Sequence, residues 1–402
     1  MRFLFAWEQG GNLGHLSKLL LIARQMRDRG HEILFAVKDV GTAHQLLDGE
    51  GFSFVQCPLA VGVGKPKREP VSFADILVEA GFADRNILSG LIHAWQTLFD
   101  AYRPAVLLAQ YAPAALIAAR LAGLASLKVD IAFESPPAVS PYPSFRPWLK
   151  VPKEELLKSE TLIMANINAI RQRRGAAPHE KLHQALAGDV ALLATLPELD
   201  HYPGRRGGRY VGPLFVVNDG DELFWSDRNV PHIFLYLRPF PGLAKILKTL
   251  DQSGADVIAF VPGIGDELKN SFTGGSLRVS SSRLKLETLL PQMDLAINHA
   301  NHGTVAATQL AGVPMLAIPG TVEQWMISRN LEQMGTAIGM KTDRVALEFE
   351  ASLKKVLSDT TYRTKAGDFA AKYAGYDQDR VVMRLANTLE KMKSKHWKEP
   401  LP

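Results

Sequence analysis

The sequence is poor in cysteine and has no long hydrophobic run. Of its 402 residues only Cys57 is a cysteine, so no disulfide can form within the chain, and a reducing, cytoplasmic compartment is expected. No uncharged apolar run reaches about 18 residues, so no transmembrane helix is predicted. The opening MRFLFAWEQGG has too short an apolar stretch for a secretory signal peptide.

The composition is that of a globular protein, with 47% hydrophobic and 22% charged residues. At this length about two domains are expected. The net charge of +5 would suit an anionic ligand, a nucleic acid or an acidic membrane face. However, the basic residues are scattered, and a solvated surface explains most of them.

Short apolar runs alternate with amphipathic stretches along both halves of the chain. This pattern predicts an α/β fold with two Rossmann-like parallel sheets covered by helices. The predicted strands of the first half are 2–7, 32–37, 53–58, 105–110, 127–133 and 189–195. Those of the second half are 232–238, 256–262, 277–280, 294–299, 314–319 and 336–340.

A glycine-rich stretch separates the two halves and predicts the domain boundaries. YPGRRGGRYVGP, residues 202–213, breaks both periodicities. We therefore predict a first domain over 1–203, a linker over 204–214, a second domain over 215–375 and a C-terminal helix and tail over 376–402. Two such domains predict a central cleft faced by the carboxyl ends of both sheets, where ligands of open parallel sheets bind.

The first loop with predicted chemistry is EQGGNLGHL, residues 8–16. Its glycines Gly10, Gly11 and Gly14 allow a tight turn and close approach to a ligand, yet their spacing does not give the dinucleotide pattern G-x-G-x-x-G. Asp39 is the one feature that favours a dehydrogenase. His15 begins the following helix and is a candidate general base, although a lone histidine at a helix start is more often structural.

The second loop, DLAINHANHGTVAATQLAGVPMLAIP (294–319), joins a predicted buried strand to an Ala-rich helix. The start of that helix offers free backbone N–H groups and a positive dipole end, which favours an anion such as a diphosphate. The candidate donors are His299, Asn301, His302, Gly303 and Thr304. The alternative is that the two histidines only cap the helix. A zinc site is disfavoured because no acidic or cysteine partners lie at ligand spacing.

Two further regions contain candidate residues. Glu323 and Gln324, at the next strand-to-helix junction, pair an acceptor with an amide and would suit sugar hydroxyls. The Pro-rich segment 135–149 is a long loop whose Tyr142, Phe145 and Trp148 favour a pocket lining over disorder.

Several motifs together resemble the inverting nucleotide-sugar glycosyltransferases of the GT-B fold, the UDP-glucosyl/glucuronosyl and macrolide transferases. GGNLGHLSKLLLIARQMRDRGHEILFAV is similar to the family's Gly-His loop, helix and second strand. RYVGPL (209–214) resembles its V-G-P entry to the donor domain, and LLPQMDLAINHANHGTVAATQLAGVPMLAIPGTVEQ resembles its H-G-G-x-G-T, G-V-P and D-Q signature. The resemblance spans nearly the whole chain in order.

The resemblance implies a metal-independent inverting hexosyltransferase that needs no cofactor beyond its dTDP- or UDP-sugar co-substrate. The first domain would bind a small aromatic, polyketide or lipid-like acceptor and the second the donor, with the C-terminal helices returning to the first domain. His15 would take the proton from the acceptor hydroxyl. His299, Gly303 and Thr304 would hold the diphosphate, and Glu323 and Gln324 the sugar.

The chain departs from the family pattern at several positions. Asn301 and His302 stand within the glycine signature, and Ala307 replaces a glutamate that contacts the ribose, which leaves room for a dTDP donor. Gln110 stands where the family has the aspartate that orients the base, so Asp130 or Glu134 is predicted to help His15. LKLE (284–287) replaces the W-x-P-Q segment, and Arg238 is a candidate phosphate ligand.

Other functions remain open at this stage. A sugar-nucleotide 2-epimerase would need carboxylates in the cleft, where the N-terminal loop offers only Glu8. A catalytically degenerate binding or partner protein would explain Gln110, Asn301 and Ala307. The predicted partners are a nucleotide-sugar donor and a small-molecule acceptor, without nucleic acid; contact with a membrane surface is left open, and the oligomeric state is not predicted.

Overall fold

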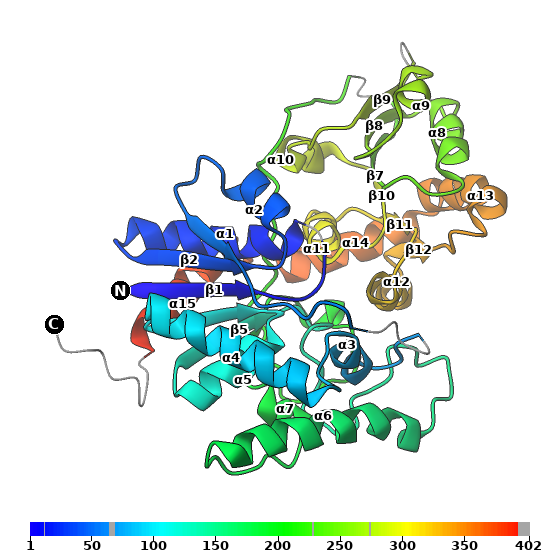
Figure 1. The fold of residues 1–402 in the computed structure, drawn as a ribbon. Coiled ribbons are helices and arrows are strands. Elements are labelled where there is room, and N and C mark those ends of the chain that lie inside the picture. The colour runs from blue at the N-terminus through cyan, green and yellow to red at the C-terminus, as the bar shows by residue number, and fades with distance from the viewer. Residues whose placement is uncertain (12, 64–68, 227–228, 273–274, 393–402) are drawn as a thin grey trace. The chain divides into compact units, whose positions relative to one another are not determined.

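The computed structural model describes residues 1–11, 13–63, 69–226, 229–272 and 275–392. The chain divides into two compact units, shown in Figure 1. Unit 1 is residues 1–214 together with the segment from Asp377 onward, and unit 2 is Phe215–Tyr376. Part of the predicted C-terminal tail, residues 393–402, lies outside the described residues.

Unit 1 is built on a six-stranded parallel sheet in the order β3-β2-β1-β4-β5-β6. Its strands are β1 (Arg2–Trp7), β2 (Glu32–Val37), β3 (Ser53–Gln56), β4 (Val106–Gln110), β5 (Ala125–Asp130) and β6 (Val190–Leu193). The central strands are buried along almost their whole length, as expected for a sheet covered by helices on both faces.

The helices of unit 1 lie in the segments between its strands and after the last one. They are α1 (Gly14–Asp28), α2 (Val40–Leu47), α3 (Phe73–Glu79), α4 (Arg85–Tyr102), α5 (Pro113–Ala122), α6 (Lys153–Arg173), α7 (Leu182–Ala185), the 3₁₀ turn η1 (Pro197–Leu199) and α15 (Gln378–Lys391). Local signals set several of their ends. Asp84 caps α4 by accepting from two backbone N–H groups, and Gly30 follows α1 at a φ of 79°.

Helix α15 belongs to unit 1 although it follows unit 2 in the chain. It packs against α1, and Arg29 Nη1 donates to Glu390 Oε2 at 2.8 Å while His31 Nε2 lies 2.8 Å from Glu390 Oε1. The C-terminal helix thus returns to the first domain, as the resemblance implied.

Unit 2 repeats the architecture, with the strand order β12-β11-β10-β7-β8-β9. Its strands are β7 (His232–Tyr236), β8 (Asp256–Phe260), β9 (Leu277–Ser280), β10 (Leu295–Asn298), β11 (Met315–Ala317) and β12 (Ala337–Gly339). Its helices are α8 (Leu243–Asp251), α9 (Asp266–Asn270), α10 (Leu286–Leu289), the 3₁₀ turn η2 (Leu290–Gln292), α11 (His302–Leu310), α12 (Val322–Met334), α13 (Val345–Ser358) and α14 (Thr360–Lys372).

The predicted fold class of two parallel Rossmann-like sheets is confirmed, and each predicted strand has a counterpart. The largest shift concerns the strand predicted over 127–133, because β5 begins at Ala125 and ends at Asp130. Residues 132–134 instead form a turn in which the Glu134 N–H donates to the Ile131 carbonyl at 3.2 Å. This early end places Glu134 at the carboxyl edge of the sheet.

Candidate active site

His15 lies in the first turn of α1, where the loop after β1 enters the helix. Its Nδ1 is 3.1 Å from Gln110 Oε1 and 3.2 Å from Glu134 Oε1. The Nδ1–H is therefore shared between an amide oxygen from the end of β4 and a carboxylate from the turn after β5. The His15 side chain is 14% exposed, so solvent still reaches part of the ring.

Glu134 is a buried carboxylate held by donors on its other oxygen. Gln110 Nε2 donates to Glu134 Oε2 at 2.7 Å, and the Ile131 N–H donates to the same oxygen at 2.9 Å. Burial alone would raise the pKa of Glu134, but the positive charge of Lys18 and the hydrogen bond and charge of His15 lower it overall. The second oxygen, Glu134 Oε1, is the one that faces His15 Nδ1.

Two aromatic rings and a glycine surround the rest of the His15 ring. Trp7 stacks on it with ring centroids 5.6 Å apart, and Tyr111 lies at 5.9 Å. A Cβ atom built on Gly10 would lie 2.4 Å from His15 Nε2, and Gly10 has a φ of 78°. Only glycine therefore fits beside Nε2. The Gly10 carbonyl accepts from Lys38 Nζ at 2.7 Å, which fixes this part of the loop.

The other glycines of the loop do not make such an approach. No described atom comes within 4 Å of a Cβ built on Gly11 or Gly14. Asn12 of the same loop lies outside the described residues. Of the three glycines singled out from the sequence, Gly10 is the one with a steric reason to lack a side chain.

Asp130 does not contact His15 directly. Its Oδ1 accepts from the Tyr111 N–H at 2.7 Å, and its Oδ2 lies 3.4 Å from Lys128 Nζ. Tyr111 has a φ of 48°, so this carboxylate holds a residue in the left-handed region. Burial raises the pKa of Asp130. Of the two acids predicted to help His15, Glu134 is the one in contact, and Asp130 instead positions the Tyr111 backbone.

Glu8 and Asp39 were the acids on which the epimerase and dehydrogenase alternatives depended. Both carboxylates accept hydrogen bonds from backbone N–H groups at helix starts. Glu8 is buried and accepts from the Ala114 and Ala115 N–H groups at the start of α5, at 2.9 and 2.5 Å. Asp39 accepts from the Gly41 and Thr42 N–H groups as the N-cap of α2. Asp39 therefore acts as a helix cap, and it no longer favours a dehydrogenase.

The aromatic residues of segment 135–149 divide into buried and exposed members. Phe145 is fully buried and stacks on Phe133 at 4.9 Å, and Tyr142 is 2% exposed with its ring edge-on to Phe73. These two rings pack the loop onto unit 1. Trp148 is 44% exposed.

His299, at the end of β10, uses both ring nitrogens inside unit 2. Nδ1 lies 2.7 Å from the Ile318 carbonyl and therefore carries the hydrogen, while Nε2 accepts from the Arg238 N–H at 3.0 Å. Burial lowers the pKa of His299, which favours this neutral ring. The direct phosphate contact predicted for His299 would require one of these hydrogen bonds to break. In the structure, the His299 ring connects the segment after β10, to which it belongs, with the segments that follow β7 and β11.

The start of α11 has no side-chain cap. Asn301 is its N-cap residue, yet Asn301 Oδ1 accepts from Gln324 Nε2 at 2.9 Å instead of from the helix. Gly303 and Thr304 lie in the partly exposed first turn, whereas His302 is buried. A helix start without a side-chain cap is the kind of position that favours an anion.

Gln324 is a structural link between two helix starts. Its Oε1 accepts from the Gly320 and Thr321 N–H groups at 2.8 and 3.1 Å, and its own N–H donates to Thr321 Oγ1, which completes a capping box on α12. Most of its hydrogen-bonding capacity is therefore used within unit 2. Glu323 beside it is partly exposed, and Arg238 is exposed.

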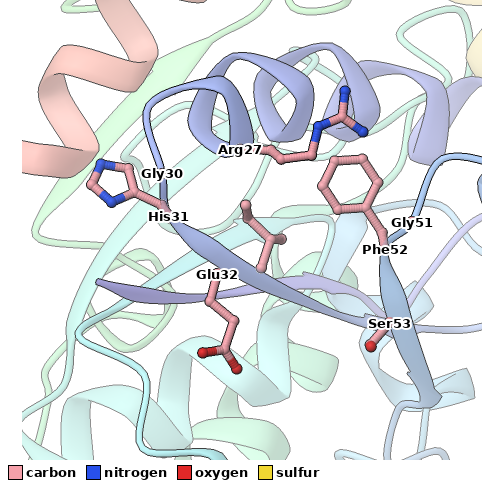
Figure 2. A pocket seen from close by; sticks show the side chains of 8 residues that line it. Arg27, Gly30, His31, Glu32, Gly51, Phe52 and Ser53 are labelled. Carbon is pink, nitrogen blue, oxygen red and sulfur yellow. The ribbon is translucent and has the colours of Figure 1, made fainter.

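Unit 1 also has a hollow of about 360 Å³ that is not lined by His15, Gln110 or Glu134 (Figure 2). Its lining includes Glu32 and Ser53, the first residues of β2 and β3, and Arg27 lies over the Phe52 ring at 4.9 Å. It is therefore at the amino edge of the sheet, whereas ligands of such sheets bind at the carboxyl edge.

Within the described ranges, no helix is long and apolar enough to cross a membrane. The same part of the chain contains no group of three or more His, Cys, Asp or Glu side chains placed to hold a metal ion.

Some residues around His15 were missed from the sequence. Trp7 and Tyr111 stand at the ends of β1 and β4, and Lys38 follows β2. All three could have been noted from the sequence because they stand at the carboxyl ends of predicted strands. That position places a residue at the carboxyl edge of the sheet, but it does not indicate the direction of its side chain.

Comparison with known proteins finds sugar-transferring enzymes in both the sequence and the structure searches. No family model matches the chain. A glycosyltransferase of PGL/p-HBAD biosynthesis from Mycobacterium tuberculosis is 25% identical over 323 residues, covering 74% of each chain. The solved structure of a spinosyn rhamnosyltransferase in complex with spinosyn aglycone has a TM-score of 0.69 at 18% identity, covering 96% of this chain and all of that one. A Streptomyces glycosyltransferase complexed with thymidine diphosphate has a TM-score of 0.65 at 17% identity, covering 96% and 99%.

The sequence relative and the structural neighbours are thus sugar-transferring enzymes, and the neighbours share the two-sheet fold along almost the entire chain. The resemblance drawn from the motifs is confirmed by both: the chain has the two-domain GT-B fold and is similar to sugar-transferring enzymes.

Proposed function

We propose that the protein transfers a hexose from a dTDP- or UDP-sugar to a hydroxyl group of a small aromatic, polyketide or lipid-like acceptor, with inversion at the anomeric carbon. The observation that carries this proposal is the shared Nδ1 contact of His15 with Gln110 and Glu134. A carboxylate on Nδ1 fixes the tautomer in which Nε2 is the basic nitrogen, and it stabilises the imidazolium formed when Nε2 accepts a proton.

In the proposed reaction His15 Nε2 removes the proton of the acceptor hydroxyl. The hydroxyl oxygen forms a bond to the anomeric carbon, and the bond from that carbon to the β-phosphate oxygen breaks. The leaving nucleoside diphosphate keeps the electron pair, so its negative charge grows as the bond breaks. The N–H groups of Gly303 and Thr304, at the positive end of the α11 dipole, stabilise this negative charge. The Arg238 guanidinium is a further ligand for the phosphates. No metal ion is required in this scheme.

A dTDP donor is favoured over UDP. Ala307 is nearly buried in α11 and offers no carboxylate to a ribose 2′-hydroxyl. The neighbour that was solved with thymidine diphosphate supports the same choice.

The test measures nucleoside diphosphate release by the full chain. dTDP- and UDP-glucose and rhamnose are each supplied with a panel of phenolic, macrolide and lipid alcohols, and the anomeric configuration of any product is read by NMR. We expect release from a dTDP-sugar with an inverted product, and its loss in His15→Ala. His93→Ala, which changes an exposed histidine on α4, is the matched control and should retain full activity.

Other outcomes would identify other functions. Thermal stabilisation by dTDP without any release, with acceptors or with water, would contradict transfer and indicate a binding protein. Conversion of a UDP-sugar to its 2-epimer would instead indicate an epimerase, which the occupied Glu8 carboxylate disfavours.

A further inference from the structure

At the carboxyl ends of the unit 2 strands, the last paired residues form a row of neighbouring side chains across the sheet. In this row neighbouring strands pair residue to residue at their carboxyl ends. From β11 through β10, β7, β8 and β9 the row reads Ala317, Asn298, Tyr236, Phe260 and Ser280. The row lies at the edge where open parallel sheets bind their ligands.

Tyr236 and Phe260 form a stacked aromatic pair in this row. Their ring centroids are 4.8 Å apart with an interplanar angle of 23°, and both residues are partly exposed. The preceding residues on the same face, Phe234 and Ile258, are 2% and 0% exposed. The sheet thus changes at its last row from a sealed interior to aromatic surface that solvent can reach.

The pair is not part of the main hydrophobic core of unit 2. That core takes the alternate residues Leu235 and Ala259, together with residues of α8 and α13. Because successive residues of a strand point to opposite faces, Tyr236 and Phe260 lie on the other face of the sheet. Their stacking therefore serves no role in that core.

The neighbours of the pair have groups suited to a nucleotide. Asn298, beside Tyr236, is fully buried, and its Nδ2 has no hydrogen-bond partner within the described residues, which is uncommon for a buried amide. The uncapped start of α11 follows β10 after a short loop. Arg238 is exposed two residues beyond Tyr236.

On the basis of the function proposed above, we propose that Tyr236 and Phe260 form the stacking platform for the nucleobase of the donor. A planar base offers a π-face to any aromatic surface. The platform lies one to two strands from β10, about 5–10 Å at ordinary strand spacing, which leaves room for a ribose between a phosphate at α11 and a base on the rings.

The experiment compares dTDP with inorganic pyrophosphate as probes, by calorimetric titration of the full chain. Tyr236→Leu and Phe260→Leu should each weaken dTDP binding about tenfold, because aromatic stacking contributes that order of affinity per base. Pyrophosphate binding should stay unchanged, since it lacks the base. Tyr236→Phe keeps the ring and should bind dTDP as the native chain does. In NMR, the thymine protons should shift upfield on binding, and the shift should vanish in Tyr236→Leu.

The control variant is Tyr362→Leu, which removes a partly buried tyrosine of α14 that packs against the core. It should bind dTDP normally, and thermal melts confirm that each variant is folded. If the Leu variants of the pair bind dTDP as tightly as the native chain, or weaken dTDP and pyrophosphate equally, the platform is wrong while sugar transfer stands. If the native chain binds no dTDP and releases no nucleoside diphosphate, both proposals are overturned.

Discussion

The two units place opposite kinds of chemistry on the carboxyl edges of two sheets with the same strand order. The edge of unit 1 holds buried acids around an imidazole, with Glu134 in contact with His15. The edge of unit 2 holds amides, a neutral histidine and an uncapped helix start. Under the proposed function, the same fold would provide a proton acceptor in one unit and a site for the diphosphate in the other.

This difference follows from what each substrate requires. Deprotonating an alcohol needs a base whose protonated form is stabilised by a negative charge nearby. Holding a diphosphate needs donors without such a charge, because a carboxylate would repel the phosphates. The carboxylates of unit 1 and the amides of unit 2 meet these opposite needs.

The largest effect is expected from removing the base in unit 1. His15→Ala should lower kcat by about 10²–10⁴-fold, the usual contribution of a positioned general base. The Kd for dTDP should stay the same, because nucleotide binding is assigned to unit 2. Steady-state kinetics and calorimetry measure the two quantities, and a large loss of dTDP affinity in this variant would break the assigned division between the units.

A change beside the base should have the next largest effect. In Gly10→Ala the new Cβ would lie 2.4 Å from His15 Nε2, and alanine would also have to adopt a φ of 78°. The ring must then move, and a displacement of about 1 Å costs about 10²-fold in rate. Gly11→Ala, which meets no atom within 4 Å, is the matched control. Equal rates for the two variants would show that the space beside Nε2 is unimportant.

The buried Glu8 makes the stability of unit 1 depend on pH. Burial raises the pKa of Glu8 from 4.5 to about 8, against the lowering effect of the Ala114 and Ala115 N–H groups. The folded chain therefore retains a proton that the unfolded chain loses above pH 4.5. Its contribution to stability is complete below pH 4.5 and is lost as the pH rises to about 8, at up to about 1.4 kcal/mol per pH unit.

Urea unfolding of Glu8→Gln across pH 5–9 tests this prediction, because glutamine cannot titrate. The free energy of unfolding of the variant should fall less steeply with pH than that of the native chain. Identical slopes would mean that Glu8 is ionised in the folded protein at neutral pH.

The smallest effect concerns the amide link of unit 2. Gln324→Ala removes the acceptor of two backbone N–H groups and the donor to Asn301, which should lower the free energy of unfolding by about 1–2 kcal/mol. Gln333→Ala, on the exposed side of the same helix, should change it by less than about 0.5 kcal/mol. Denaturant unfolding of both variants decides whether Gln324 is structural; equal stabilities would contradict that role.

Much of this could be predicted from the sequence, because strand periodicity depends on local pattern. The strands of both sheets and the strand-to-helix loops with His15 and His299 follow from apolar runs and glycine positions. The hydrogen-bond partners do not. Nothing local in the sequence tells that His299 Nε2 accepts from the Arg238 N–H, or that Gln324 donates to Asn301, because these contacts join residues 61 and 23 positions apart.

The choice between Asp130 and Glu134 shows the same limit. Asp130 is the last residue of β5 and Glu134 lies four residues after it, so the sequence offered no reason to prefer either acid. The early end of β5 and the turn after it direct Glu134 to His15 and Asp130 to the Tyr111 backbone. The position at which β5 ends therefore determines that Glu134, and not Asp130, contacts His15.

The most direct test is the pH dependence of kcat/KM for Glu134→Gln beside Asp130→Asn. Because the pKa of Glu134 is lowered, its carboxylate stays charged at neutral pH and stabilises the imidazolium of His15. Glu134→Gln should lower kcat/KM by about 10- to 10²-fold, part of the contribution of a general base, and move the acidic limb of the profile to lower pH. Asp130→Asn should leave that limb in place. Native kcat/KM and an unmoved acidic limb in Glu134→Gln would contradict a Glu134-supported base at His15.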